Sequence, residues 1–223
     1  MSKTAILFDL DGTLHDRAAG IASFAKDQFK RRGKNSVQIQ QYVDRFIELD
    51  ANGKVWKDRV YLQLLREFEL NDHPSVDELV TEYLLLFPKF SIPFEGVLQL
   101  LQQLKRRGLK IGIVTNGRVD LQNAVVTELG LKDLIDILVV SDGVGCRKPD
   151  REIFDLAIRS LKVNKELTIM VGDDEASDIL GAANAGLRSI AFRCTDTSNA
   201  TAMATSMLEV QAVVENLLGF NPL

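Results

Sequence analysis

The feature that most constrains the fold is a set of five short apolar runs. They are rich in β-branched residues, they do not alternate with polar residues, and they cover residues 5–8, 111–115, 137–141, 168–172 and 189–192. Strands that are buried on both faces of a sheet have this pattern, whereas half-exposed strands alternate. We therefore expect each run to be a buried strand of a parallel sheet.

Amphipathic helical patterns separate these runs. The clearest covers residues 97–107, where Leu98, Leu101 and Leu104 form one stripe and Gly108 follows as a helix-ending glycine. Similar patterns predict helices over residues 121–129, 151–161, 176–185 and 206–219. Strands that alternate with helices of this length predict an α/β fold with a doubly wound parallel sheet.

One long segment, residues 16–92, breaks this alternation. It holds no clean buried strand, and its aromatic residues recur at roughly helical spacing. Within it, Ser75 is followed three residues later by Glu78, which is the signature of a capping box at a helix start. We therefore expect two domains, which are an α/β core formed by residues 1–15 and 93–223 and an inserted all-helical cap domain formed by residues 16–92.

Charge and hydropathy disfavour several classes of partner. The 223 residues carry a formal net charge of −4, and no basic cluster favours binding of nucleic acid. No run approaches the roughly 20 apolar residues that span a bilayer, so we expect no membrane partner. The two cysteines, Cys146 and Cys194, have no metal-ligand spacing and suit a reducing compartment. We expect a cytoplasmic protein.

Polar side chains follow four of the five expected strands. In open parallel sheets, ligands bind beyond the carboxyl ends of the strands. One such group alone would be an ordinary turn, but their joint order predicts a site at this edge of the sheet. The groups, in chain order, are Asp9, Asp11 and Thr13; Thr115, Asn116 and Gly117; Lys148; and Gly172, Asp173, Asp174 and Asp178.

These residue types suit phosphoryl transfer. Carboxylates crowded at one edge repel one another unless a cation neutralises them, and a set of oxygen ligands without His or Cys favours Mg²⁺. Lys148 adds positive charge, and Thr115 with nearby backbone N–H groups can bind phosphate oxygens. In an extended segment Asp9 and Asp11 point the same way. One can therefore act as a nucleophile and the other as a general acid/base on the same phosphoryl group.

The same stretches resemble the motifs of the haloacid dehalogenase (HAD) superfamily. They are DLDGT at 9–13, VTNG at 114–117, KPD at 148–150 and GDDEASD at 172–178. All four occur in the family's order, and the resemblance covers the expected core domain. The helical segment lies where members with the first class of cap carry theirs, although its own sequence matches no cap that we can name.

The resemblance implies catalytic roles. Asp9 would be the nucleophile, and Asp11 the general acid/base. Thr115, Asn116 and Gly117 would bind the phosphoryl group.

The resemblance also implies a Mg²⁺ site. Lys148 would bind substrate and steady the nucleophile and its phosphorylated form. Asp178, and also Asp174, would support the site by ordering metal-bound water or by pairing with Lys148. The implied Mg²⁺ ligands are Asp9, Asp11 through its backbone carbonyl, and Asp173.

Among the chemistries of the superfamily, phosphatase fits best. Haloacid dehalogenases lack the second aspartate of the first motif, which is Asp11 here, and the phosphorylated ion pumps need membrane spans. We expect a Mg²⁺-dependent phosphatase of a small phosphorylated metabolite, acting as a monomer or homodimer through an aspartyl-phosphate. The alternatives are a phosphomutase acting on a sugar phosphate and a non-catalytic binding protein on this scaffold.

Overall fold

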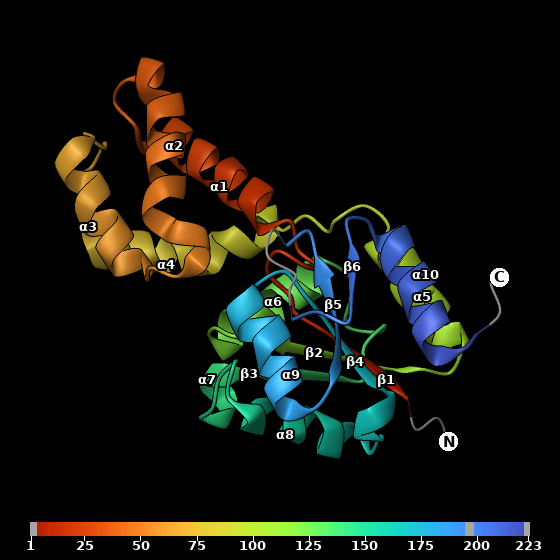
Figure 1. Ribbon diagram of the computed structural model, residues 1–223. Coiled ribbons are helices and arrows are strands. Elements are labelled where there is room, and N and C mark those ends of the chain that lie inside the picture. Colours follow the sequence, from red (N-terminus) through yellow and green to blue (C-terminus); the bar gives the residue numbers. More distant parts are fainter. Residues whose placement is uncertain (1–3, 195–198, 221–223) are drawn as a thin grey trace. The chain divides into compact units, whose positions relative to one another are not determined.

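The core of the molecule is a six-stranded, entirely parallel sheet. The structure is a computed structural model that describes residues 4–194 and 199–220. The strand order is β3-β2-β1-β4-β5-β6, so β1 lies between β2 and β4 (Figure 1). The strands are β1 (Ala5–Phe8), β2 (Lys110–Thr115), β3 (Ile137–Val140), β4 (Thr168–Gly172), β5 (Arg188–Phe192) and β6 (Ala202–Ala204). Parallel pairing brings the carboxyl ends of the inner strands together, because Phe8 lies opposite both Ile113 and Val171.

Helices cover both faces of this sheet, which confirms the predicted doubly wound α/β fold. α8 contacts β2, β3 and α9, whereas α5 and α10 pack on each other (Figure 1). Successive strand residues point to opposite faces, so a strand between two helical layers must be apolar throughout. The core helices are α5 (Val97–Arg106), α6 (Val119–Glu128), α7 (Ser141–Val144), α8 (Arg151–Leu161), α9 (Leu180–Ala185) and α10 (Met207–Leu218).

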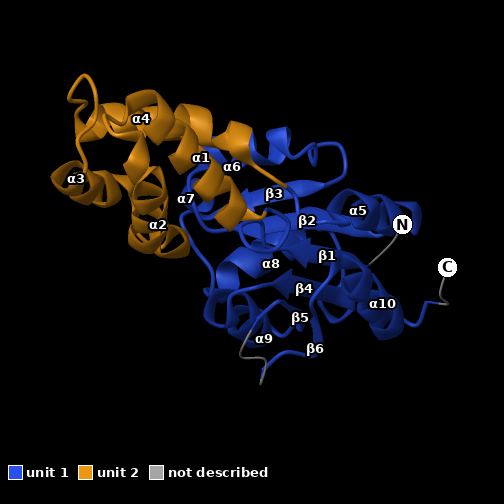
Figure 2. Ribbon diagram, turned by 90° about the horizontal axis from the view of Figure 1, so that it is seen from above, with its two compact units in different colours: residues 1–15, 93–223 blue, residues 16–92 orange. Residues whose placement is uncertain are grey.

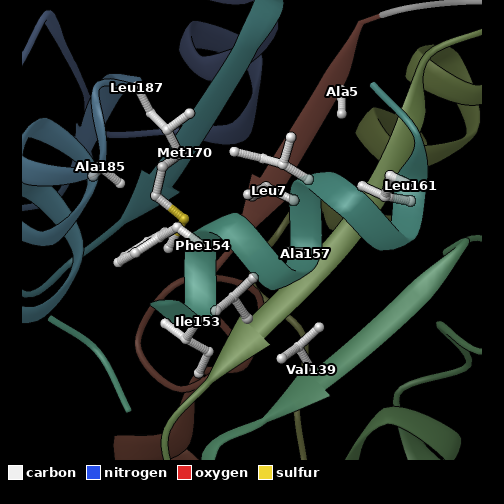
Figure 3. Packing of buried hydrophobic residues seen from close by; sticks show 13 residues of the cluster. Ala5, Leu7, Val139, Ile153, Phe154, Ala157, Leu161, Met170, Ala185 and Leu187 are labelled. Carbon is white, nitrogen blue, oxygen red and sulfur yellow. The ribbon is translucent and has the colours of Figure 1, made fainter. Parts of the chain in front are cut away.

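A buried cluster beneath α8 holds the strands in place. Leu7 of β1, Val114 of β2 and Met170 of β4 pack against Phe154 and Ala157 of α8 (Figure 3). All five side chains are completely buried. Burial of a Leu, Met or Phe side chain contributes about 1.5–3 kcal/mol, so the cluster fixes the strand ends firmly.

Two local predictions for this core were incomplete. Strand β6 was not predicted, because Ala202–Ala204 has only three residues and Met203 is more than half exposed. The helix predicted over 176–185 was wrong in its first turn, which is a π-helix over Glu175–Ile179. There the Ile179 N–H donates to the carbonyl of Asp174, five residues earlier, at 3.4 Å, which is the hydrogen bond of the wider turn.

The chain divides into two compact units, one formed by residues 1–15 and 93–223 and the other by residues 16–92 (Figure 2). The second unit is all-helical, as predicted for the inserted segment. Its helices are α1 (Arg17–Arg32), α2 (Ile39–Asp50), α3 (Lys57–Glu67) and α4 (Val76–Leu86), with 3₁₀ turns at Ser36–Gln38, Ala51–Gly53 and Phe87–Phe90. Within the described residues, no helix is long and apolar enough to cross a membrane.

The predicted capping box starts α4. The Glu78 N–H donates to the Ser75 hydroxyl at 3.2 Å, and the Ser75 N–H donates to the Glu78 carboxylate at 2.7 Å. Aromatic side chains fill the interior of the unit, since the ring of Phe24 makes edge-to-face contacts with Phe46, Tyr83 and Phe87. Such contacts add about 0.5–1.5 kcal/mol each to simple burial.

A buried cluster of charges joins three elements of the helical unit. Asp50, at the end of α2, pairs with Arg17 of α1 at 2.5 Å and with Lys57 of α3. All three side chains are at most 7% exposed. The Lys57 ammonium also lies 4.8 Å from the centre of the Tyr83 ring. The Asp50 carboxylate accepts the Gly53 N–H at 2.8 Å as well, so it fixes the turn after α2.

Candidate active site

The first motif forms a tight turn directly after β1. Asp9 continues the strand, since its N–H donates to the Val171 carbonyl at 2.9 Å. The side chain of Leu10 is buried in the fold, whereas the carboxyl of Asp11 is 26% exposed. Gly12 then adopts a φ of +95°, in the region that favours glycine. A Cβ at Gly12 would overlap the carboxyl group of Asp173, so the turn approaches β4 as closely as the backbone allows.

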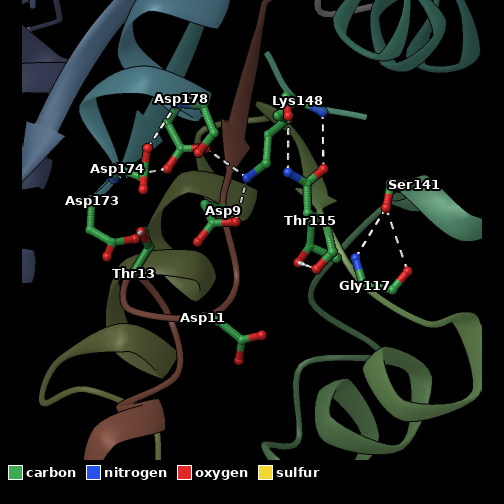
Figure 4. Close-up of polar contacts among 12 residues, drawn as sticks. Asp9, Asp11, Thr13, Thr115, Gly117, Ser141, Lys148, Asp173, Asp174 and Asp178 are labelled. Carbon is green, nitrogen blue, oxygen red and sulfur yellow. Dashed lines mark hydrogen bonds and ion pairs between the residues drawn. The ribbon is translucent and has the colours of Figure 1, made fainter. Parts of the chain in front are cut away.

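Lys148 lies between two carboxylates of the site. Its ammonium pairs with Asp9 and, at 2.7 Å, with Asp178, and it is almost completely buried (Figure 4). Burial alone would lower the pKa of Lys148, but the carboxylates of Asp178 and Asp9 outweigh burial and raise it. The side chain therefore stays a cation at any physiological pH.

Three aspartates form an acidic cluster around this lysine. One carboxylate oxygen each from Asp9, Asp173 and Asp178 lies within 4.8 Å of the others. Burial raises the pKa of Asp9 well above its ordinary value; Lys148 opposes this effect, and Asp178 and Asp173 add to it. Burial, together with Asp178, raises the pKa of Asp173 to about 6.

This donor set fits a hard divalent cation. Every candidate ligand is an oxygen, which is the preference of Mg²⁺, and a cation there would offset both the burial and the mutual repulsion that raise the two pKa values. Thr13 donates its hydroxyl to Asp173 Oδ1 at 3.1 Å and so orients that carboxylate. Asp178 also accepts the backbone N–H of Asp174 at 3.1 Å, so its carboxylate contacts both Lys148 and the backbone of the turn after β4.

The carboxyl of Asp11 lies apart from this cluster (Figure 4). His15 Nδ1 lies 2.7 Å from Asp11 Oδ1, and the amide of Gln122 donates to Asp11 Oδ2 at 2.9 Å. The two carboxylates of the first motif thus have different environments, one beside the Lys148 ammonium and one beside an imidazole and an amide. Such a difference suits different chemical tasks.

The second motif follows β2 and contacts the lysine through its backbone. The Asn116 amide donates to the Lys148 carbonyl at 3.0 Å, and Asn116 Oδ1 accepts the Lys148 N–H at 2.9 Å. Thr115 is buried at the end of the strand, and the Gly117 N–H donates to the hydroxyl of Ser141 at 3.0 Å. The Asn116 side chain therefore holds the main chain that carries Lys148, and its predicted contact with a phosphoryl group stays a prediction.

The structure brings most of the predicted residues to one edge of the sheet, and it adds a residue that the motifs did not indicate. Gln122 on α6 contacts both Asp11 and Thr115, at 2.9 and 3.1 Å. In the sequence it is one polar residue in an amphipathic helix, without a motif of its own. Only its burial, with 2% exposure, distinguishes it from surface glutamines.

The chain is similar to known proteins over most of its length. The family model described as haloacid dehalogenase-like hydrolase matches residues 6–192. The chain is 34% identical over 192 residues to the pyrimidine 5′-nucleotidase YjjG of Escherichia coli strain K12, covering 82% of each chain. It is 32% identical over 208 residues to the pyrophosphatase PpaX of Bacillus mycoides, covering 87% of this chain and 86% of the other.

A solved structure shares the fold. The magnesium-bound HAD-hydrolase YfnB of Bacillus subtilis superposes with a TM-score of 0.74 at 22% identity, covering 96% of this chain and 99% of the other. At this identity, the match supports the architecture alone.

Proposed function

Because this chain belongs to the haloacid dehalogenase-like hydrolases and is of the phosphatase type, we propose that it hydrolyses a small-molecule phosphomonoester with Mg²⁺, through an aspartyl-phosphate on Asp9. The observation that carries the proposal is the buried Lys148 ammonium between Asp9 and Asp178, beside the carboxylate of Asp173. This arrangement offers one oriented carboxylate to a phosphorus atom and surrounds it with charge that suits phosphoryl transfer.

Asp9 supplies the nucleophile. Its pKa is raised by burial, whereas the Lys148 ammonium favours the ionised form that can attack. Asp9 and Asp173, with the backbone carbonyl of Asp11, would hold Mg²⁺, which supplies positive charge to the carboxylates and to the phosphoryl oxygens. The Thr115 hydroxyl and the adjoining backbone N–H groups would bind the phosphoryl oxygens at the end of β2.

Asp11 supplies the general acid/base. As a carboxylate oxygen of Asp9 bonds to phosphorus, the bond to the ester oxygen breaks and that oxygen takes a proton from Asp11. Water then loses a proton to Asp11 and attacks the phosphoryl group on Asp9, which releases inorganic phosphate and restores both carboxyl groups. Lys148 stays beside Asp9 throughout and balances the charge of the phosphorylated side chain.

The substrate class follows from the relatives only in outline. One relative is named for a pyrimidine nucleotide and another for pyrophosphate, so their shared feature is a small phosphorylated molecule. We propose the same class of substrate for this chain, and a panel of phosphomonoesters measures which members it prefers.

The deciding experiment measures phosphate release from a panel of phosphomonoesters, with Mg²⁺ and with EDTA. Asp9→Asn removes the nucleophile with little change of shape, so turnover should fall at least 10³-fold, an order of magnitude taken from catalytic carboxylates in general. Asp133→Asn, the same change at an exposed site of the core unit, should stay fully active. Normal turnover by Asp9→Asn, or full activity in EDTA, would exclude this mechanism.

A further inference from the structure

A buried glutamine lies where the first two motifs meet. Gln122 is in the first turn of α6, seven residues after the end of β2, and only 2% of its surface is exposed. A buried amide normally pairs both its donor and its acceptor end, because an unpaired polar group in the interior costs about 1–3 kcal/mol. The hydrogen-bond partners of Gln122 therefore indicate the role of this residue.

The donor end of Gln122 is crowded with acceptors. Its Nε2 lies 2.9 Å from Asp11 Oδ2, 3.1 Å from Thr115 Oγ1 and 3.2 Å from the carbonyl oxygen of Asn116. Its Oε1 is buried and has no hydrogen-bond partner among the described residues. The hydrogen bonds of the Gln122 side chain therefore all lie at its N–H₂ end, which faces the first two motifs.

The loop after β2 packs directly on this amide. Gly117 has a φ of +144°, and a Cβ at that position would lie 3.0 Å from Gln122 Nε2. The glycine thus lets the second motif approach the amide closely. The side chain links the first motif to the second at the point where the phosphoryl group is proposed to bind.

We propose that Gln122 is a positioning residue that fixes the acid/base carboxyl of Asp11 relative to Thr115; this rests on the proposed phosphatase function. The amide donates to Oδ2 while His15 contacts Oδ1, so the plane of the carboxyl group is fixed from both sides. Each carboxyl oxygen can accept more than one hydrogen bond, so the contacts with Gln122 and His15 are compatible with proton transfer by Asp11.

This role makes a prediction that simple structural damage does not. Protonation by Asp11 matters most when the departing oxygen is a strong base, and it matters little when the departing group is a stable anion. Phenyl phosphate releases a phenol with a pKa of about 10, whereas p-nitrophenyl phosphate, of similar shape, releases a much weaker base. Loss of positioning should therefore affect phenyl phosphate selectively.

The experiment compares kcat/KM for these two esters, because kcat/KM covers the steps up to release of the phenol. In Gln122→Met, which keeps the length but removes the amide, the value should fall about tenfold or more for phenyl phosphate and less than about threefold for p-nitrophenyl phosphate. Asn123→Met removes the neighbouring, exposed amide, which donates to the Val119 carbonyl of its own helix at 2.8 Å, and it should change neither value.

A second variant guards against a misfolded first one. Gln122→Leu also removes the amide and adds no charge, and the same selective loss is expected, with thermal melting as the check on folding. Equal losses for both esters, or no loss for either, would overturn the role of Gln122 and leave the phosphatase standing. A wild-type protein that releases phosphate from neither ester nor any panel member would overturn both.

Discussion

The absence of a side chain at position 12 decides how closely the first motif approaches β4. Gly12 combines a φ of +95° with a direct approach to the Asp173 carboxyl, so it carries both a conformational and a steric requirement. Gly130 has a similar φ of +69° and no atom within 4 Å of a Cβ placed there. The two glycines thus separate the cost of the backbone conformation from the cost of the collision.

Gly12→Ala should weaken Mg²⁺ binding, whereas Gly130→Ala should not. Both substitutions carry the cost of a left-handed alanine, about 1–2 kcal/mol, but only the first displaces the Asp173 carboxylate. We expect the Mg²⁺ dissociation constant of Gly12→Ala to rise at least tenfold, a change of about 1.4 kcal/mol. Isothermal titration of each variant with MgCl₂ checks this, and equal weakening in both would show that the collision has no effect.

At this scale the sequence indicates reactive residues better than the residues that hold them. Asp9, Lys148 and Asp173 could be predicted as site residues, because carboxylates and a lysine that follow the strands form motifs suited to phosphoryl transfer. Gln122 could not, because its contact with Asp11 joins residues 111 positions apart and leaves no periodic or local signal. The two hydrogen bonds between Asn116 and the Lys148 backbone could not be predicted from the sequence for the same reason.

Among the elements, three helices meet at the buried charges around Asp50. Burial would raise the pKa of Asp50, but its contacts with Arg17 and Lys57 outweigh burial and lower it. A carboxyl whose pKa is lowered by folding contributes stability above its ordinary pKa, near 3.8, and loses that contribution as the pH falls. The junction is therefore stable at neutral pH and weakens in acid.

Asp50→Asn should destabilise the helical unit strongly at pH 7, because it leaves two buried cations without their counter-charge. Loss of one partner of a buried ion pair costs about 3–5 kcal/mol. The difference from wild type should shrink as the pH falls below about 3.8, toward the lowered pKa at which the folded wild-type carboxyl becomes neutral. Chemical denaturation across this pH range tests the prediction.

Asp44→Asn, in the exposed part of the same helix, serves as the control and should change stability by less than about 0.5 kcal/mol. Mg²⁺ binding should survive in Asp50→Asn, since the acidic cluster belongs to the other unit. A variant as stable as wild type at pH 7 would contradict the role of the junction.

Elements are predictable where their signal is long or chemically specific. The buried strands from β1 to β5 and the capping box of α4 could be predicted, because apolar runs and the Ser75–Glu78 pair each have a local physical cause. The π-turn at Glu175–Ile179 could not, since a helical hydrophobic pattern does not record one extra residue in a turn.

For the molecule as a whole, the acidic cluster links stability to pH and to metal. The pKa values of Asp9 and Asp173 are raised by folding, that of Asp173 to about 6. Groups with raised pKa values contribute stability below their ordinary pKa, and that contribution is lost as the pH rises through the folded-state pKa. The metal-free protein should therefore be less stable at pH 8 than at pH 5.

Saturating Mg²⁺ should raise the Tm more at pH 8 than at pH 5. At the higher pH the carboxyl group of Asp173, with its pKa raised to about 6, is ionised, so the cation binds there without displacing a proton. Differential scanning fluorimetry with MgCl₂ and with EDTA at both pH values measures the effect. An equal rise at both pH values would show that these carboxylates do not control metal binding.

The path of the chain between its two units affects how the protein can change in evolution. The helical segment leaves after His15 and returns at Pro93, and these two residues pair as an antiparallel bridge. On the core side the Phe94 N–H donates to the Leu14 carbonyl at 3.1 Å, and on the helical side the Asp16 N–H donates to the Ile92 carbonyl at 2.8 Å. Because exit and return lie side by side, a lineage can lengthen, shorten or replace the segment without moving a strand. The acidic cluster, which belongs entirely to the core unit, can then be retained while the inserted segment changes.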